Sequence, residues 1–167
     1  MATVYQPLDP ASAMMRPTAF APVVQATGTN GPVRALAFDA STEEAVFFRF
    51  PAIEYGSGNL SVQVDWYADT ASSGNVIWGA QIAVITPNTD SQDVETDSFA
   101  TAATVTDAHL GTTGQRLHRT SITVSSLDSL TANDDVLMRF YRDADSGSDT
   151  LAGDALVTGL VVSYSDT

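Results

Sequence analysis

The highest density of potential metal ligands lies in an aspartate-rich segment near the C-terminus. Residues 143–154 have the sequence Asp-Ala-Asp-Ser-Gly-Ser-Asp-Thr-Leu-Ala-Gly-Asp. Carboxylates on a flexible, glycine-containing loop are hard oxygen ligands of the kind that Ca²⁺ prefers. The candidate calcium ligands are Asp143, Asp145, Asp149 and Asp154. The segment lacks the glycine and the glutamate that an EF-hand loop needs at its sixth and twelfth positions, so an aspartate-rich turn with carboxylates bonded to backbone N–H groups is the alternative.

The two histidines, His109 and His118, lie nine residues apart in a segment that we expect to be a loop. This spacing matches no recognised pair of metal ligands. A serine triad needs a histidine beside a serine and a carboxylate, and the Gly-x-Ser-x-Gly motif is absent. The sequence therefore predicts two surface or loop histidines without a catalytic role.

Other catalytic chemistry has no support in the sequence. The chain has no cysteine, which removes thiol nucleophiles, disulfides and thiolate metal sites. No glycine-rich phosphate loop stands before a helix. A carboxylate pair of the glycosidase type stays open, because any two scattered acidic residues could meet in space. We expect a protein that is not an enzyme, with no cofactor other than the candidate Ca²⁺.

The charge of the chain argues against two classes of partner. Twenty acidic residues outnumber seven basic ones, all arginine, and the net charge is −13 over 167 residues. Such a surface repels the phosphates of nucleic acids and the headgroups of anionic membranes. We therefore expect neither as a partner. The N-terminal sequence also lacks a secretory signal pattern, and no segment has the apolar length of a membrane span.

Short runs of alternating apolar and polar residues predict β-strands from residue 33 onward. Apolar side chains alternate with polar ones from Leu60 to Trp66, and residues 76–85 are apolar on both faces, as in a central strand. Further strands are expected within residues 33–39, 45–50, 97–106, 122–124, 136–141 and 155–164. About eight strands with long connections predict an all-β protein, an antiparallel β-sandwich of the jelly-roll type.

Residues 1–32 differ from the rest of the chain in composition. Five prolines interrupt this segment, at positions 7, 10, 17, 22 and 32. They predict an extended N-terminal arm in front of a sandwich domain at residues 33–167. The arm is too apolar for a free tail, because it carries Met14, Met15 and Phe20. Either it packs along its own domain, or it reaches onto a neighbouring subunit with these three residues as partner-binding groups.

Several short segments of the predicted sandwich carry a distinctive combination of residues. They are Val-Gln-Val-Asp-Trp-Tyr-Ala at 62–68, Asn-Val-Ile-Trp-Gly-Ala-Gln at 75–81, Thr-Val-Thr-Asp at 104–107, Leu-Met-Arg-Phe-Tyr-Arg-Asp at 137–143 and Asp-Thr-Leu-Ala-Gly-Asp-Ala at 149–155. In order and spacing they resemble a small β-sandwich family among the virion structural proteins of tailed bacteriophages. The resemblance covers roughly residues 45–165 and leaves the arm unmatched.

The resemblance implies a capsid cement or decoration protein, which stabilises the phage head by bridging capsid subunits, or else a tail-associated module. It further implies a homotrimer with the major capsid protein as partner, located on the capsid surface of the virion and assembled in the host cytoplasm. The N-terminal arm would then be the clamp that crosses onto a partner subunit.

The alternative function is a carbohydrate-binding module of a tail fibre or a surface receptor. It requires an exposed aromatic platform with polar neighbours, and the candidates for such a platform are Tyr55, Tyr67 and Tyr141. The two tryptophans, Trp66 and Trp78, stand within strand patterns, so we expect them in the core.

Overall fold

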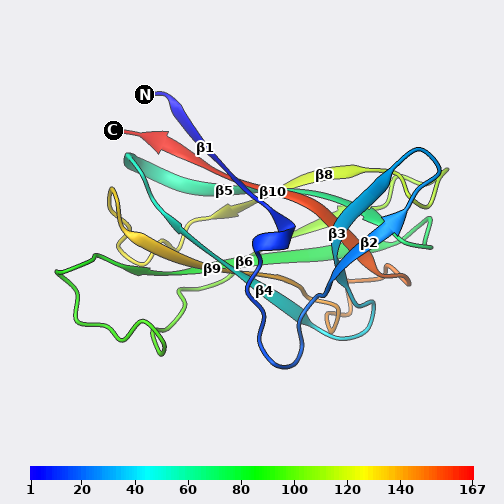
Figure 1. The fold of residues 1–167 in the computed structure, drawn as a ribbon, viewed down its shortest axis with the longest axis horizontal. Helices are drawn as coiled ribbons and strands as arrows, with labels where there is room; N and C mark the ends of the chain where they lie inside the picture. The colour runs from blue at the N-terminus through cyan, green and yellow to red at the C-terminus, as the bar shows by residue number, and fades with distance from the viewer.

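The alternation of apolar and polar residues produces two antiparallel sheets packed face to face (Figure 1). A computed structural model describes residues 1–167. The elements are β1 (Thr3–Leu8), the 3-10 turn η1 (Pro10–Ser12), β2 (Val23–Thr27), β3 (Pro32–Phe38), β4 (Glu44–Pro51), β5 (Tyr55–Ala68), β6 (Asn75–Ile85), β7 (Ala103–Ala108), β8 (His118–Val124), β9 (Asp135–Arg142) and β10 (Ala155–Asp166). None of these elements is a helix long and apolar enough to cross a membrane.

Each sheet is built from strands that are distant in sequence. The six-stranded sheet has the order β2-β3-β10-β5-β8, and β1 pairs with the second half of β10, on the edge that β3 leaves free. The four-stranded sheet has the order β4-β9-β6-β7. The N- and C-termini lie side by side, because Thr3 pairs with Ser165 (Figure 1). The all-β antiparallel sandwich of the jelly-roll type is confirmed, and each of the eight predicted strands overlaps an observed one.

Aromatic side chains from both sheets fill the space between them. Trp66 of the six-stranded sheet and Trp78 of the four-stranded sheet are both 0% exposed, with ring centroids 6.1 Å apart. Phe38 meets Trp78 edge-on at 5.2 Å, and Phe140 stacks on Trp78 at 5.3 Å. The prediction that both tryptophans belong to the core is confirmed.

Residues 1–32 lie along the sandwich and contribute two strands to it. β1 pairs with β10 over six residues, and β2 pairs with β3 over five. Between these strands the chain crosses to the other sheet, where Met14 and Phe47 form a β-bridge. Leu8 and Ala21 are buried members of the main core. In this chain the arm therefore packs along its own domain.

Candidate functional site

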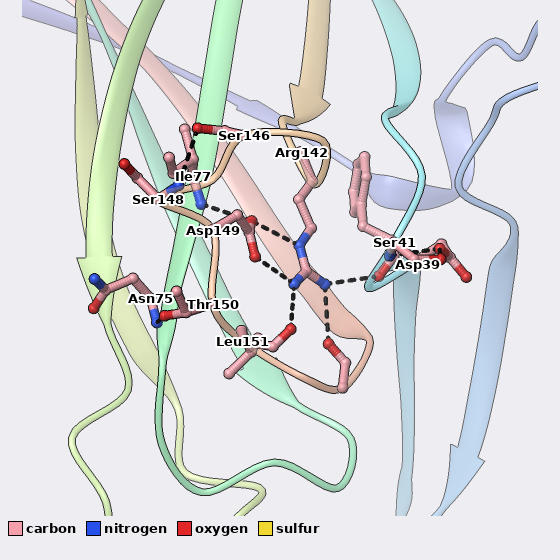
Figure 2. A network of polar contacts seen from close by, with 12 residues as sticks. Asp39, Ser41, Asn75, Ile77, Arg142, Ser146, Ser148, Asp149, Thr150 and Leu151 are labelled. Carbon is pink, nitrogen blue, oxygen red and sulfur yellow. Dashed lines mark hydrogen bonds and ion pairs between the residues drawn. The ribbon is translucent and has the colours of Figure 1, made fainter.

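The aspartate-rich segment at 143–154 is organised around a buried arginine (Figure 2). Arg142, at the end of β9, is 0% exposed, and its Nε and Nη2 donate to the two carboxylate oxygens of Asp149 at 3.0 and 2.8 Å. The same guanidinium donates to the carbonyl oxygens of Gly153 and Leu151, at 2.9 and 2.8 Å. Asp149 Oδ2 also accepts the backbone N–H of Ile77 at 3.0 Å. Both oxygens of Asp149 are thus committed within the chain.

The structure does not bring the four predicted calcium ligands together. Asp145 and Asp154 are exposed, Asp143 is half-buried, and Asp149 is turned towards Arg142. Nowhere in residues 1–167 do three or more histidine, aspartate or glutamate side chains form a group that could hold a metal ion. Burial, together with the neighbouring carboxylates of Glu43 and Asp145, raises the pKa of Asp143. The positive charge that orders this loop is the guanidinium of Arg142.

The two histidines are buried, so the expectation of surface histidines is wrong. His109 lies in the loop between β7 and β8, as predicted, whereas His118 is the first residue of β8. His109 is 8% exposed and His118 is 3% exposed. Their rings lie 4.5 Å apart, and His118 stacks on Trp66 at 4.5 Å with an interplanar angle of 21°. The physical reason is apolar cover from Trp66, which β5 supplies from a distant part of the sequence.

The tyrosines proposed for an exposed aromatic platform are also buried. Tyr55 and Tyr67 are 7% exposed and Tyr141 is 6% exposed, so that prediction is wrong. The exposed tyrosine is Tyr5, at 70%, on the outer side of β1. Tyr67 does lie on the outer face of the six-stranded sheet, but its ring packs against Ala35 and Leu156 under the β2–β3 hairpin.

A cleft of about 680 Å³ opens beside Tyr67 on the six-stranded sheet. Three parts of the chain form its walls: the β2–β3 hairpin, the end of β5, and the segment that leads into β8. The lining residues with polar side chains are Thr27, Thr29, Tyr67, Asp69, Gln115 and Thr158. A bulge in β10 between Val157 and Gly159 places Thr158 at the cleft, where its hydroxyl donates to the Asp65 carbonyl at 3.2 Å.

Most polar groups of the cleft have no partner within the chain. The side chains of Thr27, Thr29, Tyr67 and Asp69 make no hydrogen bond or ion pair in the structure, although Gln115 donates from Nε2 to the Asp69 backbone carbonyl at 2.7 Å. Burial raises the pKa of the Tyr67 phenol, and the Asp69 carboxylate adds to this effect. The hydroxyl of Tyr67 therefore stays protonated at neutral pH and can donate to a ligand.

A second cleft, of about 490 Å³, lies on the outer face of the four-stranded sheet. Met14 and Met15 line it together with Phe47, Phe99 and Leu137. The two methionines are 44% and 37% exposed. Phe20, the third predicted partner-binding residue, is half-buried and does not line this cleft.

Comparison with solved structures finds similar β-sandwiches among carbohydrate-binding modules. No family model matches the sequence, and no curated protein matches it either. A family 28 carbohydrate-binding module specific for non-crystalline cellulose is similar in structure over 83% of this chain and 79% of its own, with 15% identity and a TM-score of 0.47.

Two further modules show the same kind of similarity. A family 35 carbohydrate-binding module of Cellvibrio japonicus covers 98% of this chain and 99% of its own at 12% identity and a TM-score of 0.45. A family 11 module of Clostridium thermocellum, in complex with a β-1,3-1,4-mixed-linked tetrasaccharide, covers 96% and 87% at 11% identity and a TM-score of 0.44. At these identities the similarity concerns the arrangement of strands.

These findings correct the resemblance to phage virion proteins. The similar structures named above are carbohydrate-binding modules, and no family model of virion proteins matches the sequence. The prediction of a capsid cement or decoration protein is wrong. The physical reason is that alternating segments such as 62–68 specify a β-sandwich, and one sandwich fold carries many functions. The capsid partner, the virion location and the homotrimer depended on that resemblance, and they stay predictions that the structure does not test.

Proposed function

We propose that this chain is a non-catalytic glycan-binding module whose ligand site is the cleft beside Tyr67. One observation carries the proposal: hydroxyl and carboxylate groups without partners, together with a glutamine amide, line a concave site over a buried aromatic ring. Ligand sites in proteins are concave, have an apolar floor and use a few convergent polar groups. A sugar ring has the matching chemistry, because it offers hydroxyls that both donate and accept.

The charge of the cleft favours a neutral glycan. Asp69 is the charged residue among the lining side chains, and no arginine lines the cleft. The whole chain carries a net charge of −13. A uronate or sulfate group in the cleft would face Asp69 without a compensating cation, at an energetic cost that grows as water is excluded. Neutral polysaccharides avoid this cost.

A glycan array followed by titration calorimetry tests the proposal. The array includes non-crystalline cellulose and the β-1,3-1,4-mixed-linked tetrasaccharide, and acidic glycans serve as the negative class. We expect Tyr67→Phe to weaken binding about tenfold, because one hydrogen bond to the ligand contributes roughly 1 kcal/mol. Asp69→Asn keeps the shape of the side chain and is expected to reduce the discrimination against acidic glycans.

The matched control is Tyr141→Phe, which removes the same hydroxyl from the opposite sheet and is expected to leave binding unchanged. Binding that is unaffected by Tyr67→Phe and Asp69→Asn would place the ligand elsewhere. An array without signal for any neutral glycan would refute the proposed function itself.

A further inference from the structure

The two buried histidines hold one loop closed by accepting hydrogen bonds from its backbone. The N–H of Leu110 donates to Nε2 of His118 at 3.0 Å, and the N–H of Gly111 donates to Nδ1 of His109 at 3.0 Å. His109 Nε2 lies 3.0 Å from the carbonyl oxygen of Gly114, to which it donates its proton. Because a backbone N–H can only donate, Nε2 of His118 and Nδ1 of His109 must both be unprotonated. The closed loop therefore requires two neutral imidazoles in defined tautomers.

The same loop forms one wall of the cleft beside Tyr67. Gln115 and Leu117 are lining residues, and Gln115 also ties the loop to the end of β5 through the Asp69 carbonyl. Gly111 and Thr112 have positive φ angles of 71° and 69°, so the turn adopts left-handed backbone conformations that need support. Loss of the two bonds to the histidines would remove that support and release the wall.

We infer that the histidine pair is a pH-sensitive switch, which holds the loop that forms this wall of the cleft in place at neutral pH and releases it under mildly acidic conditions. This inference rests on the proposed function and adds its regulation: acidification releases the glycan. Protonation of either ring places an N–H where the loop's own N–H points, so the bond becomes a repulsive contact. A histidine changes charge between pH 5 and 8, which makes this a change within the physiological range.

The charged groups around the histidine pair do not raise the pKa of His118 above its ordinary value. The charged groups that act on the pKa of His118 are Asp107 on β7 and Arg116 in the loop. The Asp107 carboxylate accepts the indole N–H of Trp66 at 2.8 Å. Burial lowers the pKa of His118, and the neighbouring His109 lowers it further, whereas Asp107 raises it. Nδ1 of His118 is buried without a hydrogen-bond partner, so no carboxylate accepts a hydrogen bond from this atom.

The lowered pKa of His118 determines how the stability of the closed loop changes with pH. The opened loop takes up a proton near the ordinary histidine pKa of about 6.5, before the closed loop does. The closed state is therefore fully stable above about pH 6.5 and loses stability as the pH falls below that value.

Hydrogen exchange measured by NMR on the full chain tests the switch without any ligand. We expect the protection factors of the Leu110 and Gly111 amides, corrected for intrinsic exchange, to fall at least about tenfold between about pH 7.5 and about pH 5.5. The amides of β5 serve as an internal control and should keep their protection. Equal protection of the loop amides at both pH values would overturn the inference.

Two substitutions separate histidine titration from that of the many carboxylates. In the double variant with His109→Asn and His118→Gln, side-chain carbonyls replace the two acceptor nitrogens and do not titrate. Its loop amides should keep the same protection at both pH values. A pH-dependent loss equal to that of the wild type would assign the opening to other groups. If the double variant does not fold, the single variants His109→Asn and His118→Gln make the same comparison one ring at a time.

Calorimetry with the mixed-linked tetrasaccharide at the same two pH values tests the link to binding. We expect the affinity of the wild type to fall on acidification and that of the double variant to stay constant. Equal wild-type affinity at both pH values would overturn the regulatory role and leave the proposed function standing. An array without signal for any neutral glycan, with pH-dependent exchange intact, would refute the glycan function and the control of binding while the loop switch stands.

Discussion

Arg142 and Arg119 each hold an aspartate through two hydrogen bonds, but in opposite environments. The side chains of Arg142 and Asp149 are 0% and 1% exposed, whereas those of Arg119 and Asp65 are 63% and 20% exposed. Arg142→Met leaves the Asp149 carboxylate buried without its cation. We expect the free energy of unfolding to fall by about 3–5 kcal/mol, measured by urea denaturation at neutral pH.

The exposed pair is the matched control for this prediction. Arg119→Met removes two hydrogen bonds to an aspartate, as Arg142→Met does, but no bonds to backbone carbonyls. We expect a much smaller loss because water solvates the remaining Asp65. Combining Arg142→Met with Asp149→Leu should recover part of the loss, since no charge is then left unpaired. Equal destabilisation by the two single arginine variants would contradict the role assigned to Arg142.

Gly79 in β6 is required because the Tyr141 ring of β9 lies directly over it. A Cβ atom added at Gly79 would overlap the ring of Tyr141, which is 6% exposed and carries the Arg139 guanidinium 4.2 Å above its centre. We expect Gly79→Ala to lower the free energy of unfolding by about 1–3 kcal/mol, because the ring must move out of a packed position. Gly159→Ala in β10 is the control, since no atom lies within 4 Å of its added Cβ; an equal loss there would argue against the contact with Tyr141.

At the scale of elements, β1 is an integral strand and its contribution can be measured. Its last residue, Leu8, is 8% exposed and belongs to the main core, whereas Tyr5 on the same strand is 70% exposed. We expect Leu8→Ala to cost about 2–5 kcal/mol of unfolding free energy, and Tyr5→Ala less than about 0.5 kcal/mol. Deletion of residues 1–8 should cost at least as much as Leu8→Ala. Unchanged stability on deletion would show that β1 does not contribute to the sandwich.

The sequence predicts those strands in which apolar and polar residues alternate, because the alternation itself identifies the buried face. From Leu60 to Trp66 the alternation alone identifies β5, because every second side chain enters the core. β1 gave no such signal: it pairs with one neighbour, contains Pro7, and buries only Leu8 fully. Edge strands of this kind are fixed by a partner elsewhere in the chain, here β10, which local periodicity cannot reveal.

The candidate site depends on long-range contacts even more strongly. Tyr67 occupies a polar-face position in the alternation of β5, and only the distant β2–β3 hairpin buries it. The burial of His109 and His118 could not be predicted, because the ring that covers them, Trp66, comes from another strand. Asp149 was a candidate ligand by composition, and its partner Arg142 was visible in the sequence, but only the folded loop brings them together.

At the scale of the whole molecule, unpaired negative charge is the dominant electrostatic feature. Four of the seven arginines form ion pairs with carboxylates within 4 Å, and four of the twenty carboxylates are satisfied in this way. The other carboxylates repel one another at neutral pH. Self-repulsion of this kind destabilises the compact state and is screened by salt.

Salt should therefore stabilise the protein. We expect the melting temperature to rise by several degrees between about 0.01 M and about 1 M NaCl, as the Debye length falls from about 30 Å to about 3 Å. A relief of 1 kcal/mol corresponds to about 2–4 °C for a chain of this size. Scanning calorimetry at neutral pH measures the shift.

A charge-reduced variant tests whether repulsion between carboxylates causes that shift. Glu54, Glu95 and Asp145 are exposed, and their side chains make no ion pair in the structure. The triple variant with Glu54→Gln, Glu95→Gln and Asp145→Asn should melt at a higher temperature in low salt and respond less to NaCl than the wild type. A melting temperature that falls as NaCl is added would mean that the four ion pairs outweigh the repulsion, because salt weakens attraction between exposed charges as well.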